Sequence, residues 1–217
     1  MRCSRICERA AAEGKVDTLL FDADGVLQRP LATRRDAWRR MLGPEGDLDR
    51  FIAAVFEAED PALTGGVDFV GLLAEVLVEW NCHGTMADAL ATWTMIEPDA
   101  AITDIVTALR KSGVKCCLAT NQEAFRATYM SGSLEYARLF DREFYSCWMG
   151  LAKPAEAYFT AILSELDVRP SRVLFIDDRE ANVRAAREVG INAAIFDVDS
   201  GPAALRQTMR AFGIEAV

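Results

Sequence analysis

Residues 16–26, VDTLLFDADGV, join an apolar run to two acidic residues and a glycine. The run at 16–21 is rich in Val, Leu and Phe and predicts a strand that is buried on both faces. Asp22 and Asp24 follow it two positions apart, a spacing that in an extended chain places both side chains on the same side. Gly25 directly behind them permits a sharp turn and a close approach of the backbone to a ligand. The stretch therefore predicts a strand that delivers two carboxylates to one point.

Four further short apolar segments alternate with helical patterns along the chain, at 114–119, 144–147, 172–176 and 191–196. Helix signals stand between most of them: Pro98 and Asp99 open one helix, which Gly113 closes, and Pro154 opens another. The alternation of strand and helix predicts an α/β fold with a doubly wound parallel sheet. Its central strand is expected at 16–21.

One connection breaks this alternation, because about seventy residues after the first strand show no strand pattern. Thr33, Asp47 and Thr85 stand at positions typical of helix N-caps, and the segment 67–80 has a further apolar face. We expect about four helices that form a small cap. The predicted domains are a core of residues 1–30 and 98–217 and a helical cap of residues 31–97.

The composition of the 217 residues is that of an ordinary soluble protein, with 51% hydrophobic and 26% charged residues. The net charge of −9 would repel nucleic acid, and no basic stripe offsets it, so nucleic acid is not expected as a partner. No apolar run approaches the roughly 20 residues that span a bilayer, and the first residues lack the apolar stretch of a signal peptide. No membrane partner is expected, and a cytoplasmic location is predicted.

The six cysteines do not resemble a disulfide framework. Cys116 and Cys117 lie next to each other in an apolar run and are predicted to be buried, reduced thiols. Cys3 and Cys7 have no second ligand pair downstream, so a structural zinc site is not expected there.

Seven polar residues stand where predicted strands end or in the loops beyond them: Asp22 and Asp24, Thr120 and Asn121, Lys153, and Asp177 and Asp178. Ligands bind at the carboxyl edge of an open α/β sheet, so these side chains are expected to converge on one crevice. Four carboxylates close together repel one another unless a cation neutralises them. Mg²⁺ takes a few carboxylates and keeps positions for water and phosphate. The pattern predicts a magnesium site where Lys153 and Thr120 hold a phosphate dianion.

Four stretches resemble, in order, spacing and strand context, the four successive motifs of the haloacid dehalogenase-like (HAD) hydrolases. They are VDTLLFDADGV (16–26), LATNQ (118–122), GLAKPAEAYF (150–159) and FIDDREANVRAAREVG (175–190). The resemblance extends from about residue 16 to residue 196 and implies a Rossmann-like core. The predicted helical insert stands where that superfamily places its helical cap, between the first and second motifs.

The resemblance implies a role for each matching residue. Asp22 would be the nucleophile that forms a phospho-aspartyl intermediate, and Asp24 the general acid and base. Thr120 and Lys153 would orient the phosphate, which places Lys153 among the catalytic residues, and Asn121 beside them is a further expected substrate-binding residue.

For the metal, the resemblance implies Asp178 and Asp22 as direct ligands, together with the backbone carbonyl of Asp24. Asp177 would be a water-mediated or outer carboxylate. Asn182 is similar to a positioning residue of the family.

The leading prediction is a magnesium-dependent phosphatase that hydrolyses a small-molecule phosphate ester. A sugar phosphate is one candidate, because the motifs are most similar to sugar-phosphate phosphatases and to the N-terminal phosphatase domain of soluble epoxide hydrolases. The family's dehalogenases lack the second acid, so Asp24 favours phosphate over halide. A phosphomutase stays open, as do two alternatives from other classes, a receiver domain and a non-catalytic binding protein. The order of the acidic motifs and the helical insert both argue against a receiver. The oligomeric state is open.

Other conspicuous residues of the insert have simpler interpretations. Arg34 and Arg35 have two interpretations, contact with an anionic substrate and a solvated helix face, of which the solvated face is favoured. The tryptophans of the insert are expected in its packing. His83 is the only histidine and falls in the insert, so no Ser-His-Asp arrangement can be assembled.

Overall fold

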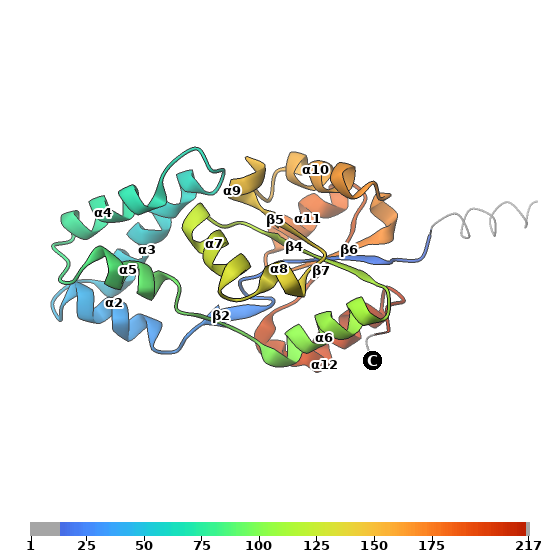
Figure 1. The fold of residues 1–217 in the computed structure, drawn as a ribbon, viewed down its shortest axis with the longest axis horizontal. Coiled ribbons are helices and arrows are strands. Elements are labelled where there is room, and N and C mark those ends of the chain that lie inside the picture. Colours follow the sequence, from blue (N-terminus) through green and yellow to red (C-terminus); the bar gives the residue numbers. More distant parts are fainter. Residues whose placement is uncertain (1–13, 216–217) are drawn as a thin grey trace, which may run out of the picture.

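The computed structural model describes residues 14–215 as a five-stranded parallel sheet with helices on both faces and a separate group of helices at one end (Figure 1). The strand order is β5-β4-β1-β6-β7, with β1 in the centre as predicted. The strands are β1 Thr18–Phe21, β4 Lys115–Thr120, β5 Arg142–Tyr145, β6 Val173–Asp177 and β7 Asn192–Ile195. The predicted α/β class and the doubly wound parallel sheet are confirmed.

The position of β5 differs from its prediction. The apolar segment 144–147 predicted a strand, but the pairing with β4 covers Arg142–Tyr145, and the chain then turns into the short helix α9, Ser146–Met149. β5 is an edge strand, so its first residues, Arg142 and Glu143, are partly open to solvent and show no apolar pattern. The apolar signal therefore marked only the buried end of the strand.

The side chains of the sheet alternate between two hydrophobic clusters, one on each face. On β1, Leu19 and Phe21 pack into one cluster and Leu20 into the other, and all three are fully buried. The first face is covered by α6 (Ala100–Lys111), α7 (Ala124–Gly132), α8 (Tyr136–Leu139) and α12 (Gly201–Arg210), and the second by α10 (Glu156–Leu166) and α11 (Glu180–Glu188). Short 3-10 turns occupy Pro170–Arg172 (η2) and Val198–Ser200 (η3). Because full burial of a Leu or Phe side chain contributes about 1.5–3 kcal/mol, β1 is held firmly from both sides.

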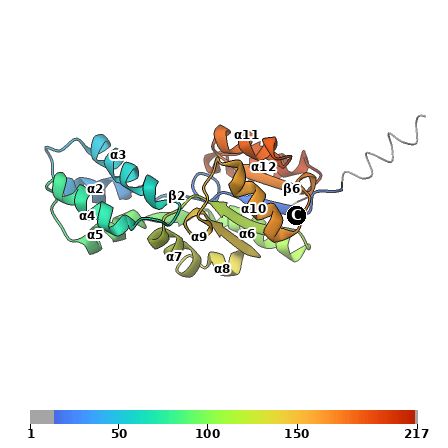
Figure 2. The same cartoon turned by 90° about the horizontal axis from the view of Figure 1, so that it is seen from above.

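The group of helices at one end, which we call the helical insert, lies beside the sheet (Figure 2). It consists of α2 (Arg34–Leu42), α3 (Leu48–Glu59), the 3-10 turn η1 (Asp60–Ala62), α4 (Phe69–Glu79) and α5 (Met86–Trp93). Phe51 packs edge-on against Trp38 and Trp80, with ring centroids 5.6 and 5.7 Å apart. The division into a core and a cap of residues 31–97 stays a prediction, which the separate hydrophobic cluster of the insert supports.

Two strands missed by the sequence pattern connect the insert to the sheet. β2 (Gln28–Pro30) and β3 (Ile96–Pro98) form an antiparallel ribbon of three residues each, too short to show a period of two. Of the predicted N-caps, Asp47 and Thr85 accept hydrogen bonds from the first turns of α3 and α5. The Thr33 side chain makes no such bond, because its backbone is already helical.

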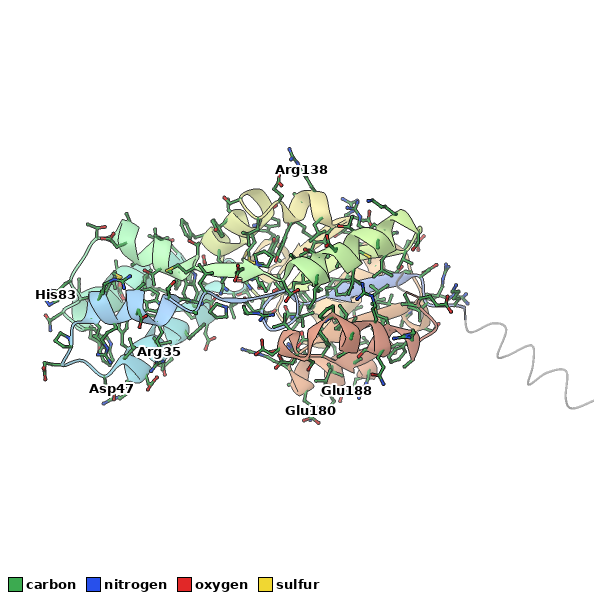
Figure 3. All side chains as sticks on the ribbon, turned by 90° about the horizontal axis from the view of Figure 1, so that it is seen from below. Arg35, Asp47, His83, Arg138, Glu180 and Glu188 are labelled. Atoms are coloured by element: carbon green, nitrogen blue, oxygen red, sulfur yellow. The ribbon has the colours of Figure 1, made fainter. Side chains whose placement is uncertain are left out.

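The remaining sequence predictions concern cysteines, the histidine and membranes. Cys116 and Cys117 are free and fully buried, as predicted, whereas Cys3 and Cys7 lie outside the described residues. His83 lies at the outer end of the insert (Figure 3). Across residues 14–215, none of the helices is long and apolar enough to cross a bilayer.

Candidate active site

The centre of the site is the ammonium group of Lys153, which stands in the loop between α9 and α10. Its Nζ lies 2.8 Å from Asp22 Oδ1 and 2.7 Å from Asp177 Oδ2, and it donates to the carbonyl of Ala119 at 3.0 Å. The two aspartates meet because β1 and β6 are neighbours in register, with Phe21 opposite Ile176. The predicted convergence of the first, third and fourth motifs at one edge of the sheet is therefore present.

Asp177 and Asp178 are adjacent in sequence but have different surroundings. Asp177 is fully buried, and its Oδ1 accepts a hydrogen bond from the backbone N–H of Arg179 at 2.8 Å. Both of its carboxylate oxygens accept from Asn182 Nδ2 at 3.0 Å. Asp178 is exposed, and among the described residues no other residue donates a hydrogen bond to its carboxylate or forms an ion pair with it. Asp178 is thus the acid with oxygens available to a ligand.

The donor set fits a hard divalent cation. Asp22, Asp177 and Asp178 each offer an oxygen atom, and these atoms lie within 4.8 Å of one another. Oxygen ligands of this kind, with room for water and substrate, suit Mg²⁺. Asp177 already binds Lys153 and Asn182, so its best role is the outer carboxylate that the family resemblance implied.

Burial and mutual repulsion set the charge state of this cluster. Burial raises the pKa of Asp22 to about 7, with Asp177 adding to the rise and Lys153 opposing it. The pKa of Asp178 is also raised, by burial and by Asp177. For Lys153, burial favours the neutral amine, but the two carboxylates outweigh it and raise the pKa. Without a cation, the site therefore holds more negative charge than it can stabilise.

The Asp24 carboxylate binds other residues than those around Lys153. Its Oδ1 accepts from Gln28 Nε2 at 2.9 Å and from Arg126 at 2.8 Å, and its Oδ2 accepts from Gln122 Nε2 at 2.8 Å. Burial alone would raise the pKa of Asp24, but Arg126 and the two amides outweigh it, so the pKa is lowered. The Asp24 carboxylate is not part of the acidic cluster. The prediction that Asp24 contributes a metal ligand is therefore restricted to its backbone carbonyl.

Sequence reasoning missed the three residues that hold Asp24. Gln28 is fully buried on β2, and its Oε1 accepts from the hydroxyl of Tyr136 at 2.9 Å. Arg126 and Gln122 are also buried, in and just before α7. The one available signal was the amide Gln28 directly after the apolar pair Val26 and Leu27 that follows the acidic motif.

Thr120 and Asn121, predicted to bind substrate, both lie at the carboxyl end of β4. Asn121 donates to the backbone carbonyl of Lys153 at 2.8 Å and accepts from its N–H at 2.9 Å, so it fixes the Lys153 loop. Thr120 is buried, and its hydroxyl accepts from Gln122 at 3.3 Å. Their contacts with substrate stay a prediction.

The strand order, the Lys153-centred carboxylates and the inserted helices together define a doubly wound α/β protein with an acidic site at the carboxyl edge of its sheet. The family model of the haloacid dehalogenase-like hydrolases matches residues 16–190, and the chain belongs to this family.

Individual relatives show how far the likeness extends. Bifunctional epoxide hydrolase 2 of Mus musculus is 29% identical over 112 residues, which are 50% of this chain and 20% of that protein, so the chain spans about a fifth of that relative. Phosphorylated carbohydrates phosphatase of Thermotoga maritima is 23% identical over 199 residues, 88% of this chain and 90% of that protein. A HAD family enzyme from Bacteroides thetaiotaomicron, solved with magnesium and inorganic phosphate, has a TM-score of 0.72 at 19% identity and covers 88% of this chain and 98% of that chain. This structural likeness shows the fold alone.

We predict that Gly25→Ala weakens Mg²⁺ binding. Gly25 has φ +75°, and an added Cβ would stand 2.5 Å from Asp178 Oδ2, so the carboxylate would have to move. We expect at least a tenfold higher Kd for Mg²⁺ by titration calorimetry and a loss of about 1 kcal/mol in the free energy of unfolding. Gly113→Ala is the matched control, because Gly113 has φ +88° and nothing within 4 Å of the added Cβ. Equal Mg²⁺ affinities of the two variants would contradict the prediction.

We predict that Asp178→Ala weakens Mg²⁺ affinity more than Asp177→Ala does. Asp178 has free oxygens, whereas those of Asp177 are occupied by Lys153, Arg179 and Asn182. Asp177→Ala should instead lower the melting temperature more, since it leaves buried donors without an acceptor. Metal titration and thermal unfolding of both variants measure the two effects, and the reverse order of affinities would show that the direct-ligand assignment is wrong.

The raised pKa of Asp22 predicts a pH dependence of stability in the metal-free protein. A carboxyl whose pKa rises on folding destabilises the folded state only where it is ionised, so the penalty is absent below pH 4 and complete above about pH 7. In chelator, the stability of Asp22→Asn relative to the wild type should rise by on the order of 2 kcal/mol between pH 5 and pH 8. Urea unfolding at the two pH values measures this difference. A constant difference would argue against a buried, titrating Asp22.

Proposed function

We propose that the chain is a magnesium-dependent phosphatase that hydrolyses a small phosphate monoester through a phospho-aspartyl intermediate on Asp22. The observation that carries the proposal is the buried Lys153 ammonium, which holds Asp22 and Asp177 together beside the exposed Asp178. The site thus combines a nucleophile, a fixed positive charge and oxygen ligands for a metal. The Thermotoga maritima relative supports phosphatase chemistry and makes a sugar phosphate one candidate substrate.

The nucleophile is oriented by two donors. Asp22 Oδ1 accepts from the N–H of Ala23 at 2.8 Å and pairs with Lys153. Its other oxygen, Oδ2, accepts no hydrogen bond from the described residues and is available for attack. Bound Mg²⁺, held by Asp22, Asp178 and the Asp24 carbonyl, would neutralise phosphate oxygens.

The reaction has two halves. An Asp22 oxygen attacks phosphorus in line, the bond from phosphorus to the leaving alcohol breaks, and Asp24 gives a proton to the alcohol oxygen. Water then attacks the phosphorus of the acyl phosphate, Asp24 takes its proton, and inorganic phosphate leaves as the Asp22 carboxylate is restored. Arg126 favours the ionised form of Asp24, which is the form that the second half needs. In the first half, the negative charge of the bound phosphate opposes Arg126 and helps Asp24 to hold its proton.

The proposal predicts that Asp22→Asn abolishes turnover. The amide is nearly isosteric but is not a competent nucleophile, so we expect kcat to fall by at least about 10³-fold. The measurement is release of inorganic phosphate and of alcohol from a panel of phosphate esters, with Mg²⁺ and with chelator. Asp104→Asn, the same change at an exposed position of α6, is the control and should retain full activity.

Two outcomes would overturn the proposal. Substantial magnesium-dependent activity in Asp22→Asn would remove the phospho-aspartyl step. Transfer of phosphate to a second position of the substrate, with no net release, would identify a phosphomutase, the alternative that shares the first half-reaction.

A further inference from the structure

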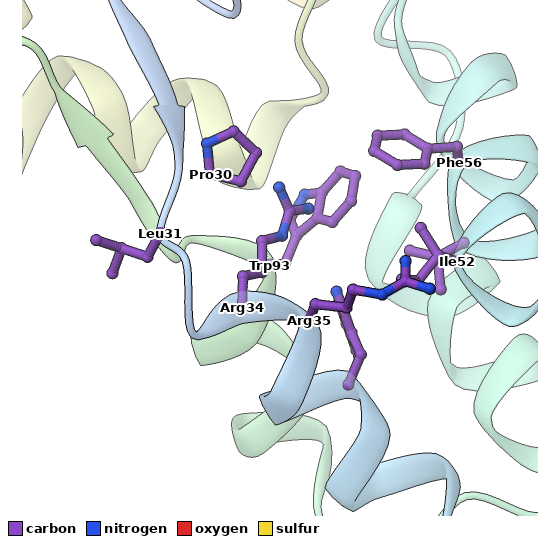
Figure 4. Close-up of a pocket in the computed structure, with 9 residues that line it drawn as sticks. Pro30, Leu31, Arg34, Arg35, Ile52, Phe56 and Trp93 are labelled. Atoms are coloured by element: carbon purple, nitrogen blue, oxygen red, sulfur yellow. The ribbon is translucent and has the colours of Figure 1, made fainter. Parts of the chain in front are cut away.

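A cavity in the helical insert stands next to the proposed site. It has a volume of about 180 Å³ and lies among α2, α3, α5 and the end of β2 (Figure 4). Its walls are mainly apolar and aromatic, and include Pro30, Trp38, Ile52, Phe56 and Trp93. A cavity of about 150 Å³ with apolar walls accommodates benzene, so this one has room for a ring-sized group.

Two charged side chains line this apolar cavity, the exposed Arg35 and the buried Arg34. Arg34, the first residue of α2, is only 7% exposed, and its guanidinium lies over the Trp93 ring, 4.9 Å from the centroid. In the part of the chain that the structure describes, no group accepts a hydrogen bond from this guanidinium. Burial lowers the pKa of Arg34 to about 10, so it keeps its charge at neutral pH. In the described part of the chain, the buried side-chain atoms without a partner are Gln122 Oε1 and Arg126 Nε, so the Arg34 nitrogens keep some contact with solvent and can be reached by an anion.

The expectation of a solvated helix face was wrong for Arg34. Its neighbour Arg35 does have that character, because its side chain is 56% exposed and pairs with Asp49 at 2.6 Å. Arg34 points instead between the insert and the core, toward Trp93 (Figure 4). The two adjacent arginines therefore have different environments.

Contacts link this cavity to the proposed general acid. Arg126, which binds Asp24, lies 5.2 Å from the centroid of the same Trp93 ring that Arg34 covers. The Trp93 indole N–H donates to Glu123 at 3.0 Å, which ties the ring to the start of α7. Trp93 and Arg126 thus connect the cavity to Asp24, the group that would protonate the leaving alcohol.

The acids near Arg34 do not neutralise its guanidinium through an ion pair. Asp24 and Glu59 raise its pKa and Arg126 lowers it, yet none of these acids forms an ion pair with Arg34. Burial raises the pKa of Glu59 to about 7, so near neutral pH it carries only part of a charge. Arg126 is already paired with Asp24, so among the described residues Arg34 is the cation at the Trp93 ring that lacks an ion pair.

We infer that this cavity receives the leaving group, and that the substrate is the phosphate ester of an alcohol with a ring-sized apolar body and a carboxylate that pairs with Arg34. A guanidinium binds a carboxylate through two parallel hydrogen bonds. A sugar would instead place most of its hydroxyls against walls that are mainly apolar. The inference deepens the proposed function and rests on it for the position of the phosphate.

The test compares three esters in the presence of Mg²⁺: 4-carboxyphenyl phosphate, phenyl phosphate and glucose 6-phosphate. Wild-type kcat/KM should be highest for 4-carboxyphenyl phosphate and lowest for glucose 6-phosphate. Arg34→Met keeps an unbranched stem over Trp93 and removes the charge. It should lower the ratio of kcat/KM between the carboxyphenyl and phenyl esters by at least tenfold, through KM. Arg40→Met makes the same change at an exposed position of the same helix and should leave the ratio unchanged.

A second variant covers the case in which Arg34→Met does not fold. Phe56 is 43% exposed and its ring lies 5.4 Å from Trp93, so Phe56→Ser should fold and lower kcat/KM for both aryl esters relative to glucose 6-phosphate. A preference of the wild type for glucose 6-phosphate would overturn the inference while leaving the phosphatase intact. An unchanged carboxyphenyl-to-phenyl ratio in a folded Arg34→Met protein would overturn it as well.

Binding of the leaving alcohol separates this inference from the proposed function. By calorimetry, 4-hydroxybenzoate should bind the wild type at least tenfold more tightly than it binds Arg34→Met, and phenol should show no such difference. If this holds while no ester is hydrolysed, the proposed function fails and the cavity assignment stands. If esters are hydrolysed but 4-hydroxybenzoate does not distinguish the two proteins, the cavity assignment fails.

Discussion

The ammonium of Lys153 lies between Asp22 and Asp177 with 1% of its side chain exposed, and the rest of the site depends on this contact. Two buried carboxylates from neighbouring strands would repel each other, and burial would protonate them, without a positive charge between them. One lysine against two acids leaves a residual negative charge, to which the exposed Asp178 adds. The same arrangement that stabilises the folded edge of the sheet therefore also creates an attraction for a divalent cation.

The second organising contact joins the core to the insert. Arg126 on α7 binds Asp24 and lies against Trp93 at the end of α5, and Glu123 just before α7 accepts from the Trp93 indole. Both polar partners are buried, so displacing the insert would uncover charges that are now shielded. The charge state of Asp24 is consequently tied to the position of the insert, since Arg126 is the largest influence that lowers its pKa.

Most of the core fold and the position of the site could be predicted from sequence because their signals were periodic or local. Short apolar segments, buried on both faces of the sheet, predicted the strands, and the acidic pairs that follow two of these strands located the site. The antiparallel ribbon β2/β3 escaped because three residues carry no period. Gln28, Gln122 and Arg126 escaped for a different reason: each is a polar residue whose partner is Asp24, and two of them lie about a hundred residues away from it in the chain. Such a contact is set by how α7 packs against β2, which no local pattern records.

Arg34 shows why burial decides the meaning of a charge. On sequence spacing it could not be distinguished from Arg35, yet Arg35 pairs with an exposed acid while Arg34 closes an apolar cavity without an acceptor. The site is thus divided electrostatically: acidic oxygens that need a cation lie at the edge of the sheet, and the Arg34 guanidinium, which has no ion-pair partner among the described residues, lies beneath the insert. A ligand that satisfies both halves must place a phosphate beside the metal ligands and a second anionic group beside Arg34, with an apolar spacer between them. The walls of the cavity supply the surface that such a spacer requires.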